Sequence, residues 1–178
     1  VTGRLKTSPP NRILDLGTGS GAIAIALARH FTDANVVAVD SSPAALELAE
    51  DNIRSAGLAA KVATCRSHWF ENVDGLFDLI ISNPPYLTTE EWESAQPEVR
   101  EHEPREALVA ENSGLACLNQ IVEEAGAYLS PGGLVAFETG PDQHESITAK
   151  AAKSGYQKIE SLKDLAKRNR FILLWKTC

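Results

Sequence analysis

Short apolar runs alternate with amphipathic stretches along most of the 178-residue chain. Most of the apolar runs are rich in β-branched residues, which is typical of strands buried on both faces, and they lie at residues 12–16, 36–39, 61–65, 77–82 and 134–138. Apolar residues recur at helical spacing between several of these runs, at residues 22–31, 43–56, 115–129 and 143–154. Strands that alternate with helices predict an α/β domain built on a doubly wound, mostly parallel sheet.

Two further strand patterns, at residues 157–161 and 170–175, finish the chain. Only residues 162–169 separate them, which is too short for a helical crossover, so we expect an antiparallel pair at one edge of the sheet. The full prediction is a seven-stranded α/β sheet, mostly parallel, with an antiparallel C-terminal edge hairpin.

Residues 1–178 are expected to form a single domain, because 43% of the chain is hydrophobic and its length suits one core of ordinary size. Residues 1–11 are polar and contain two prolines, so we interpret them as a tail or linker. Residues 87–112 are charged and lack clean periodicity, which indicates a long loop that is functional or mobile. The chain begins at Val1 and contains no methionine, so we expect that it is not a complete open reading frame.

The apolar run at residues 77–82 stops abruptly at Asn83-Pro84-Pro85-Tyr86. The strand must end there because the two prolines have no N–H to donate to a neighbouring strand. Ligands bind outside the carboxyl ends of the strands in an open α/β sheet, so Asn83 and Tyr86 are expected to face a crevice. The alternative is a stiff exit turn with a packed tyrosine.

Three glycines, at positions 17, 19 and 21, follow the first predicted strand and precede the first predicted helix. Glycines at such a turn bring backbone N–H groups close to a ligand. Gly17, Gly19 and Ala22 also satisfy the dinucleotide pattern G-x-G-x-x-G/A, so the loop alone leaves NAD binding open. Asp40 ends the second strand, where a carboxylate accepts hydrogen bonds from the hydroxyls of a ribose, so an adenosine cofactor is expected.

Asp15 lies two residues before the first glycine. A carboxylate there is unfavourable beside a pyrophosphate but compatible with a cationic sulfonium and ammonium. The alternative is that Asp15 hydrogen-bonds the amides of its own loop. Either interpretation disfavours a phosphate at this position.

Charge and composition exclude several classes of function. The formal charge of −7 argues against binding nucleic acid by phosphate neutralisation. The three cysteines are far apart in sequence, and the four histidines show no ligand spacing, so neither disulfides nor a metal site is expected. No apolar run approaches the roughly 18 residues of a membrane span and no signal-peptide pattern opens the chain, so we expect a cytoplasmic protein without membrane contact.

The segments DLGTGSG, VVAVD and SNPPY resemble the cofactor loop, ribose acid and catalytic motif of class I S-adenosylmethionine-dependent methyltransferases that modify planar amide or amino nitrogens. The later segments are similar to the PrmC/HemK branch, the glutamine methyltransferases of peptide chain release factors, and they are Glu98–Arg100, Glu103–Arg105, Ala107–Val109 and Gly114–Leu115. The resemblance runs from about Arg12 to the C-terminus. It implies a Rossmann-like fold, S-adenosyl-L-methionine as cofactor and a release factor as protein substrate.

The resemblance also implies roles for individual residues. The Asn83 side-chain oxygen and the Pro84 carbonyl would each accept one N–H of the target amide, Pro85 would keep the turn rigid, and Tyr86 would cover a flat substrate group. The residues expected to bind the cofactor are Asp15, Gly17, Thr18, Gly19, Ser20, Gly21, Asp40, Ser41, His68, Trp69 and Asn83.

The chain departs from this branch in several places. We expect this chain to lack the small helical substrate-recognition domain that usually precedes the glycine loop. His68 stands where an acid is usual beside the tryptophan, and residues 111–112 and 167–168 lack the usual glycines.

The cationic side chains of the last turn are expected to form a solvated cluster, and they are Lys163, Lys167, Arg168 and Arg170. Glu138 ends a strand at the same edge as Asn83, where it either touches the pocket or makes a structural hydrogen bond.

Alternative functions stay open at this point. The two proposed acceptors also suit an adenine or guanine amino group on flipped-out DNA or RNA, so nucleic acid is an alternative substrate. A non-catalytic cofactor-binding module is a second alternative, which an intact NPPY sequence disfavours. An NAD oxidoreductase comes last, because Asp15 argues against a dinucleotide and no acid or base for hydride transfer is evident.

Overall fold

The computed structural model describes residues 9–94, 108–109 and 114–176. The described strands, which form one sheet, are β1 (Arg12–Leu16), β2 (Asn35–Asp40), β3 (Val62–Arg66), β4 (Phe77–Ser82), β5 (Leu129–Glu138), β6 (Lys158–Lys163) and β7 (Asn169–Trp175). The described helices are α1 (Ala22–His30), α2 (Pro43–Ser55), α3 (Thr89–Glu93), α7 (Ala116–Tyr128) and α8 (His144–Lys153), and a short 3₁₀ turn, η2 (Pro141–Gln143), precedes α8.

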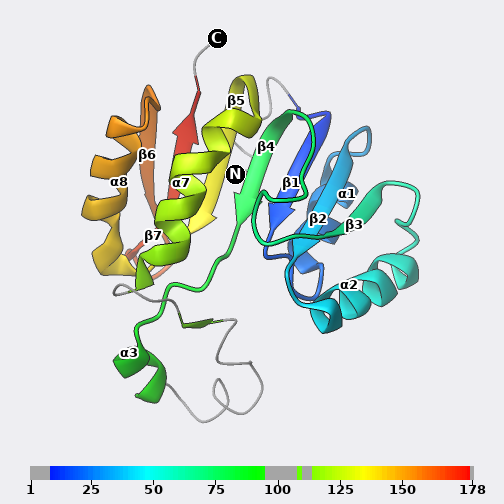
Figure 1. The fold of residues 1–178 in the computed structure, drawn as a ribbon, viewed down its shortest axis with the longest axis horizontal. Helices are drawn as coiled ribbons and strands as arrows, with labels where there is room; N and C mark the ends of the chain where they lie inside the picture. Colours follow the sequence, from blue (N-terminus) through cyan, green and yellow to red (C-terminus); the bar gives the residue numbers. More distant parts are fainter. Residues whose placement is uncertain (1–8, 95–107, 110–113, 177–178) are drawn as a thin grey trace.

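The strands lie in the order β3-β2-β1-β4-β5-β7-β6 (Figure 1). The first five are parallel, and β7 runs antiparallel to both β5 and β6. The predicted doubly wound, mostly parallel sheet with a C-terminal antiparallel hairpin is therefore confirmed. The last strand of the chain lies inside the sheet, between β5 and β6, and β6 forms the edge.

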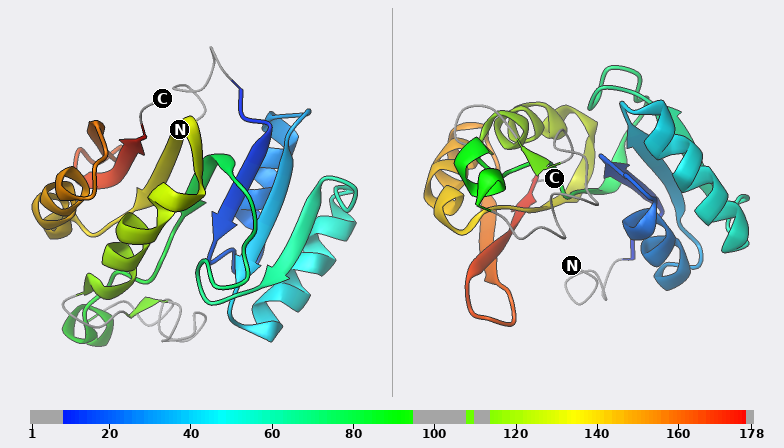
Figure 2. Two further views of the ribbon diagram at one scale, coloured as in Figure 1. Left: turned by 45° about the horizontal axis from the view of Figure 1, so that its top comes forward. Right: turned by 90° about the horizontal axis from the view of Figure 1, so that it is seen from below.

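Helices cover both faces of the sheet (Figures 1 and 2). Side chains from α1 and α2 form one core with one face of the strands, and α7 and α8 form a second core on the other face. Successive residues of β1 alternate between the two, since Ile13 belongs to the first core and Leu14 to the second. Both faces of the central strands are thus buried, which explains the continuous apolar runs in the sequence.

The start of α2 follows the local rules for helix capping. The Ser42 hydroxyl accepts a hydrogen bond from the Ala45 N–H at 3.3 Å, and Pro43 occupies the first turn. Gly57 follows the helix with a φ of 72°. This helix begins three residues after Asp40, the last residue of β2, so its first turn lies at the carboxyl edge of the sheet.

Two local predictions need correction. The segment expected to be irregular contains α3, which begins with a capping box: the Thr88 hydroxyl accepts from the Glu91 N–H, and the Glu91 carboxylate accepts from the Thr88 N–H. Strand β5 begins at Leu129, five residues before the strand predicted at residues 134–138, and its register with β4 shifts in this added part.

Some predictions concern residues outside the described ranges. Most of the proposed tail at residues 1–11 is among them. So are residues 98–100, 103–105 and 107, which belong to the segments that resemble glutamine methyltransferases. Within the described part of that region, Leu87 forms a parallel bridge with Val109, and its N–H donates to the Leu108 carbonyl at 2.9 Å.

We predict that the stability of the fold depends strongly on β4, the strand between β1 and β5. Leu79 on this strand is fully buried, so Leu79→Ala should lower the free energy of unfolding by about 2–5 kcal/mol through lost apolar contact and the remaining cavity. Leu76, just before the strand, is 46% exposed and serves as the matched control, and Leu76→Ala should change it by less than about 1 kcal/mol. Urea denaturation measures both variants, and equal losses would contradict this packing.

Candidate active site

The carboxyl ends of β1 to β4 surround a cleft of about 1130 Å³. The right-hand view of Figure 2 looks at the molecule from this edge. The lining includes nine of the residues predicted from the sequence: Gly17, Gly19, Ser20, Asp40, Ser41, His68, Trp69, Asn83 and Pro85. The other predicted residues, which do not line it, are Asp15, Thr18, Gly21, Pro84 and Tyr86.

The glycine loop is held in a conformation that favours glycine. Gly17, Gly19 and Gly21 have φ values of 67°, 55° and 78°, in the left-handed region. At Gly21 a side chain would also lack space, because a Cβ atom there would lie 3.2 Å from the Cβ atom of Ala49 on α2. The N–H of Thr18 donates to the Val39 carbonyl at 2.8 Å, which fixes the loop beside the end of β2.

The Asp40 carboxylate connects the two loops that form the floor of the cleft. One oxygen, Oδ2, accepts the Gly19 N–H at 2.9 Å, and the other, Oδ1, accepts the Ser42 N–H at 2.9 Å. Asp40 is half-buried and lines the cleft, and a carboxylate has about four lone-pair sites. It therefore retains acceptor capacity for the hydroxyls of a ribose.

Asp15 lies beneath the loop and is fully buried. Its Oδ2 accepts the Thr18 hydroxyl at 2.6 Å and the Ala24 N–H at 3.1 Å, and its Oδ1 has no hydrogen-bond partner among the described residues. Burial raises the pKa of this carboxyl from 3.8 to about 6, and the Asp40 charge adds to the rise, whereas the hydrogen bonds from Thr18 and Ala24 oppose it. These contacts are those of the alternative in which Asp15 holds its own loop, and contact with a cofactor stays a prediction.

The segment after β3 places an aromatic ring against the glycine loop. A Cβ atom on Gly17 would lie 3.7 Å from the Trp69 ring. Trp69 has a φ of 48°, which is strained for a bulky side chain and is more frequent at functional sites than elsewhere. His68 is exposed beside it, with Nδ1 3.6 Å from the Glu71 carboxylate. His68 and Trp69 both line the cleft, and their contact with a cofactor stays a prediction.

The strand end at Asn83 is anchored to β1. The Ser82 hydroxyl donates to the Leu16 carbonyl at 2.8 Å, and Ser82 is buried. Asn83 and Pro85 line the cleft, Asn83 is exposed, and Pro84 is buried. The prediction that Asn83 faces a crevice is therefore confirmed, whereas the same prediction for Tyr86 is not, since Tyr86 does not line this cleft.

Tyr86 is turned toward β5 and β7. Its hydroxyl donates to Glu138 Oε1 at 2.8 Å and accepts from an Arg170 nitrogen at 3.1 Å. The structural hydrogen bond of Glu138 is thus confirmed, and the cover that Tyr86 would give a substrate group stays a prediction. Arg170 corrects another expectation: its side chain is 19% exposed and reaches Tyr86, whereas Lys163, Lys167 and Arg168 are exposed as expected.

Part of the cleft wall was not predicted from the sequence. These residues come from the start of α2, the ends of β2 and β3, the described part of the loop after α3, and α7, and they are Val39, Ser42, Ala44, Ala45, Leu48, Ser67, Val109 and Cys117. Leu48 is an apolar residue on the outer face of α2, where its side chain is 51% exposed, and an exposed apolar residue is a local sign of a binding surface. Burial raises the pKa of the Cys117 thiol, so this residue contributes a neutral wall.

The chemistry of the lining suits one kind of ligand. Among the described lining residues Asp40 is the only carboxylate, and none is lysine or arginine. Asp40 would repel a pyrophosphate bound there, and no cationic side chain of the described lining would compensate. A ribose diol or a sulfonium would not be repelled. An adenosine cofactor without phosphates therefore fits these residues better than a dinucleotide does.

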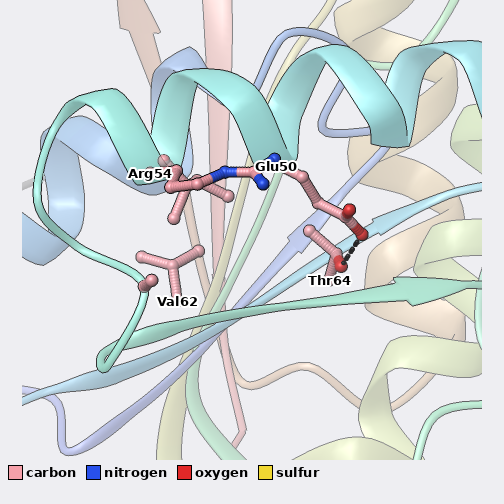
Figure 3. Close-up of a pocket in the computed structure, with 6 residues that line it drawn as sticks. Glu50, Arg54, Val62 and Thr64 are labelled. Carbon is pink, nitrogen blue, oxygen red and sulfur yellow. Dashed lines mark hydrogen bonds between the residues drawn. The ribbon is translucent and has the colours of Figure 1, made fainter.

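Other features of the described chain carry no competing site. A hollow of about 280 Å³ lies between α2 and β3, where the Thr64 hydroxyl donates to Glu50 at 2.7 Å (Figure 3). The described residues include no group of three or more histidine, cysteine, aspartate or glutamate side chains placed to hold a metal ion. Among the helices that the structure describes, none has the length and apolar character that crossing a membrane requires.

Comparison with known proteins adds independent information. Residues 2–99 match a family model described as the methyltransferase small domain. The chain is 41% identical over 161 residues to the release factor glutamine methyltransferase of Agrobacterium fabrum and 43% identical over 164 residues to that of Thermosynechococcus vestitus, covering 90% of this chain in each case. The chain spans about half the length of these curated relatives, 56% of each.

Solved structures support the fold. A methyltransferase from Pyrococcus furiosus superposes with a TM-score of 0.72 over 98% of this chain and 80% of that one, at 23% identity. A ribosomal protein L11 methylase from Lactobacillus delbrueckii gives 0.68 over 97% and 72%, at 24% identity. At this level of identity the likeness shows a shared Rossmann-like architecture.

We predict that Asp15 makes the stability of the protein depend on pH. The folded state binds more protons than the unfolded state between pH 3.8 and about 6, so stability falls as the pH rises through this window. The loss for a pKa raised from 3.8 to about 6 is on the order of 3 kcal/mol. Asp15→Asn should remove it, so wild type should gain about 2–3 kcal/mol relative to this variant when the pH is lowered from 7.5 to 4.

Urea denaturation at the two pH values measures this difference, and titration of other groups cancels between the two proteins. Asp33→Asn provides the control, since it makes the same change at an exposed aspartate. A difference between wild type and Asp15→Asn that does not vary with pH would show that Asp15 is not buried in this way.

Proposed function

The chain belongs to the methyltransferase small-domain family, and from this premise we propose that it transfers a methyl group from S-adenosyl-L-methionine to the side-chain amide nitrogen of a glutamine in a peptide chain release factor. The observation that carries the proposal is the position of Asn83, which is exposed in the cleft whose floor is formed by Asp40 and the glycine loop. A release factor as substrate would place the reaction in the cytoplasm.

Different residues of the cleft would contact different parts of the cofactor. Asp40 would accept the ribose hydroxyls, Trp69 would pack against the adenine, and the backbone of residues 17–21 would contact the remainder. When bound, the cofactor supplies an electrophilic methyl group on a cationic sulfur. The absence of lysine and arginine from the described lining supports this choice, because nothing there repels a sulfonium.

The task of the protein is to present a poor nucleophile. An amide nitrogen reacts slowly because its lone pair is delocalised into the carbonyl group. In our proposal the Asn83 side-chain oxygen and the Pro84 carbonyl each accept one of the two N–H groups, which leaves the lone pair directed at the methyl group. Orientation of this kind contributes on the order of 7–11 kcal/mol, so no strong general base is needed, and the proton leaves after the nitrogen is alkylated.

The substrate class is supported by relatives rather than by the cleft. The relatives from Agrobacterium fabrum and Thermosynechococcus vestitus are named release factor glutamine methyltransferases. The formal charge of −7 and the lack of cationic lining residues in the described chain disfavour nucleic acid. An adenine or guanine amino group remains the second candidate, because the same pair of acceptors holds an exocyclic NH₂ group and a cleft of about 1130 Å³ has room for a flipped base.

We predict that labelled S-adenosylmethionine will transfer its methyl group to a release factor, offered intact or as a short peptide with its glutamine-containing loop. Replacement of that glutamine should abolish labelling, since the amide nitrogen is the acceptor. DNA and RNA are offered in parallel reactions. Label found only in nucleic acid would contradict the proposal and favour the second candidate.

We predict that Asn83→Ala separates catalysis from cofactor binding. Loss of one of the two amide acceptors should lower kcat by at least about 100-fold, because the target nitrogen is no longer oriented. The dissociation constant for S-adenosylmethionine, measured by calorimetry, should change less than about threefold, which is under 1 kcal/mol. Asn35 starts β2 at the opposite edge of the sheet, so Asn35→Ala is the matched control. Normal turnover by Asn83→Ala would mean that the amide is not held in this way.

We predict the reverse for Asp40. Asp40→Ala should weaken S-adenosylmethionine binding by about 10- to 100-fold, the loss expected for hydrogen bonds to a charged group. Asp33→Ala, on an exposed aspartate before β2, should bind like wild type. An unchanged dissociation constant for Asp40→Ala would place the ribose elsewhere.

A further inference from the structure

The Tyr86 hydroxyl lies between two charged side chains from the antiparallel end of the sheet. It donates its single hydrogen to Glu138 Oε1 at 2.8 Å and accepts a hydrogen from Arg170 at 3.1 Å. Glu138 is the last residue of β5, and Arg170 is the second residue of β7. One hydroxyl thus joins the turn after β4 to the end of β5 and the start of β7, which are distant in sequence.

Arg170 makes several further contacts at this junction. The same nitrogen lies 3.4 Å from the Thr139 carbonyl and 3.7 Å from Glu138 Oε1, and another nitrogen of the guanidinium lies 3.9 Å from Asp164. Its guanidinium carbon is 5.7 Å from the centre of the Tyr86 ring. The Arg170 and Glu138 side chains are 19% and 28% exposed, so water screens these interactions less than on an open surface.

The backbone of Tyr86 is held separately. Its carbonyl accepts a hydrogen bond from the Gln143 side chain at 2.7 Å, and Gln143 in turn accepts the Gly140 N–H at 2.9 Å. Gly114 packs so closely that a Cβ atom there would lie 2.0 Å from the Tyr86 carbonyl oxygen. These contacts do not involve Arg170, so its loss should leave the turn folded but less firmly oriented, because one of the two charged partners of the Tyr86 hydroxyl is gone.

We propose that Arg170 and Glu138 are positioning residues that act through the Tyr86 hydroxyl to fix the Asn83–Tyr86 turn in the orientation that methyl transfer requires. The inference rests on the proposed role of Asn83 and Pro84 as amide acceptors. The rings of Pro84 and Pro85 lock two of the φ angles between Asn83 and Tyr86, so a rotation at Tyr86 is absorbed less readily there and shifts Asn83. A displacement of about 1 Å at such a site costs on the order of 100-fold in rate.

The test compares Arg170→Gln with Arg168→Gln, the same change two residues away. Arg168 is 59% exposed, and the contacts described for its side chain are to Asp164 alone. We expect Arg170→Gln to lower kcat about 10- to 100-fold with KM and the dissociation constant for S-adenosylmethionine little changed, and Arg168→Gln to resemble wild type. A merely structural role would instead affect cofactor binding and kcat together.

A double substitution shows whether Arg170 acts through Tyr86. Tyr86→Phe removes the hydroxyl, so adding Arg170→Gln to it should cause little further loss of kcat. Losses that multiply would overturn the proposal, because Arg170 would then act by another route.

Hydrogen exchange gives a readout that does not need turnover. In Arg170→Gln the amides of residues 86–88 should exchange faster than in wild type, those of residues 17–21 should not, and Arg168→Gln should match wild type. If the wild-type protein methylated neither glutamine nor nucleic acid, the proposed function would be overturned. The exchange data alone would then decide whether Arg170 positions the turn. Unchanged exchange at residues 86–88, or faster exchange with normal kcat in an active enzyme, would overturn the inference.

Discussion

Parallel pairing of β1 with β2 and β4 puts Leu16 opposite Val39 on one side and Ser82 on the other, and the candidate site depends on this register. The residues that follow these three positions are Gly17, Asp40 and Asn83, so the loop, the carboxylate and the amide leave the sheet at one level. Two hydrogen bonds preserve this alignment, from the Ser82 hydroxyl to the Leu16 carbonyl and from the Thr18 N–H to the Val39 carbonyl. A slip of one residue in either pairing would turn the side chains to the opposite face.

Features that are unfavourable for stability gather around this edge. Asp15 is a fully buried carboxyl with one unpaired oxygen among the described residues, and Trp69 has a left-handed backbone conformation. Each such feature costs on the order of 1–3 kcal/mol and persists because its surroundings are rigid. The two continuous cores on either side of the sheet provide that rigidity. Unfavourable features at the edge of the sheet are expected in a protein whose cores stabilise the scaffold and whose ligand site lies at that edge.

Much of the fold and part of the site could be predicted because their signals are local. Asp40 and Asn83 each follow an apolar run directly, so their place at a strand end is evident from neighbouring residues. Helix α3 was missed because five residues are too few to show periodicity, although Thr88 and Glu91 carry the capping pattern. Cys117 and Val109 reach the cleft, and Arg170 reaches Tyr86, through tertiary packing, which no local pattern reports. For Asp15 the sequence left two interpretations, and only its contacts with Thr18 and Ala24 favour the structural one.

We propose that Asn83 and Pro84 present one planar nitrogen to a methyl donor held over Asp40. Tandem mass spectrometry of a release factor after incubation with the protein and S-adenosylmethionine provides the decisive test, because it identifies the methylated residue. We expect one added methyl group on the side chain of a single glutamine. A methyl group on an oxygen, a carboxylate or a lysine nitrogen would contradict it, since none of those acceptors needs two N–H groups to be held.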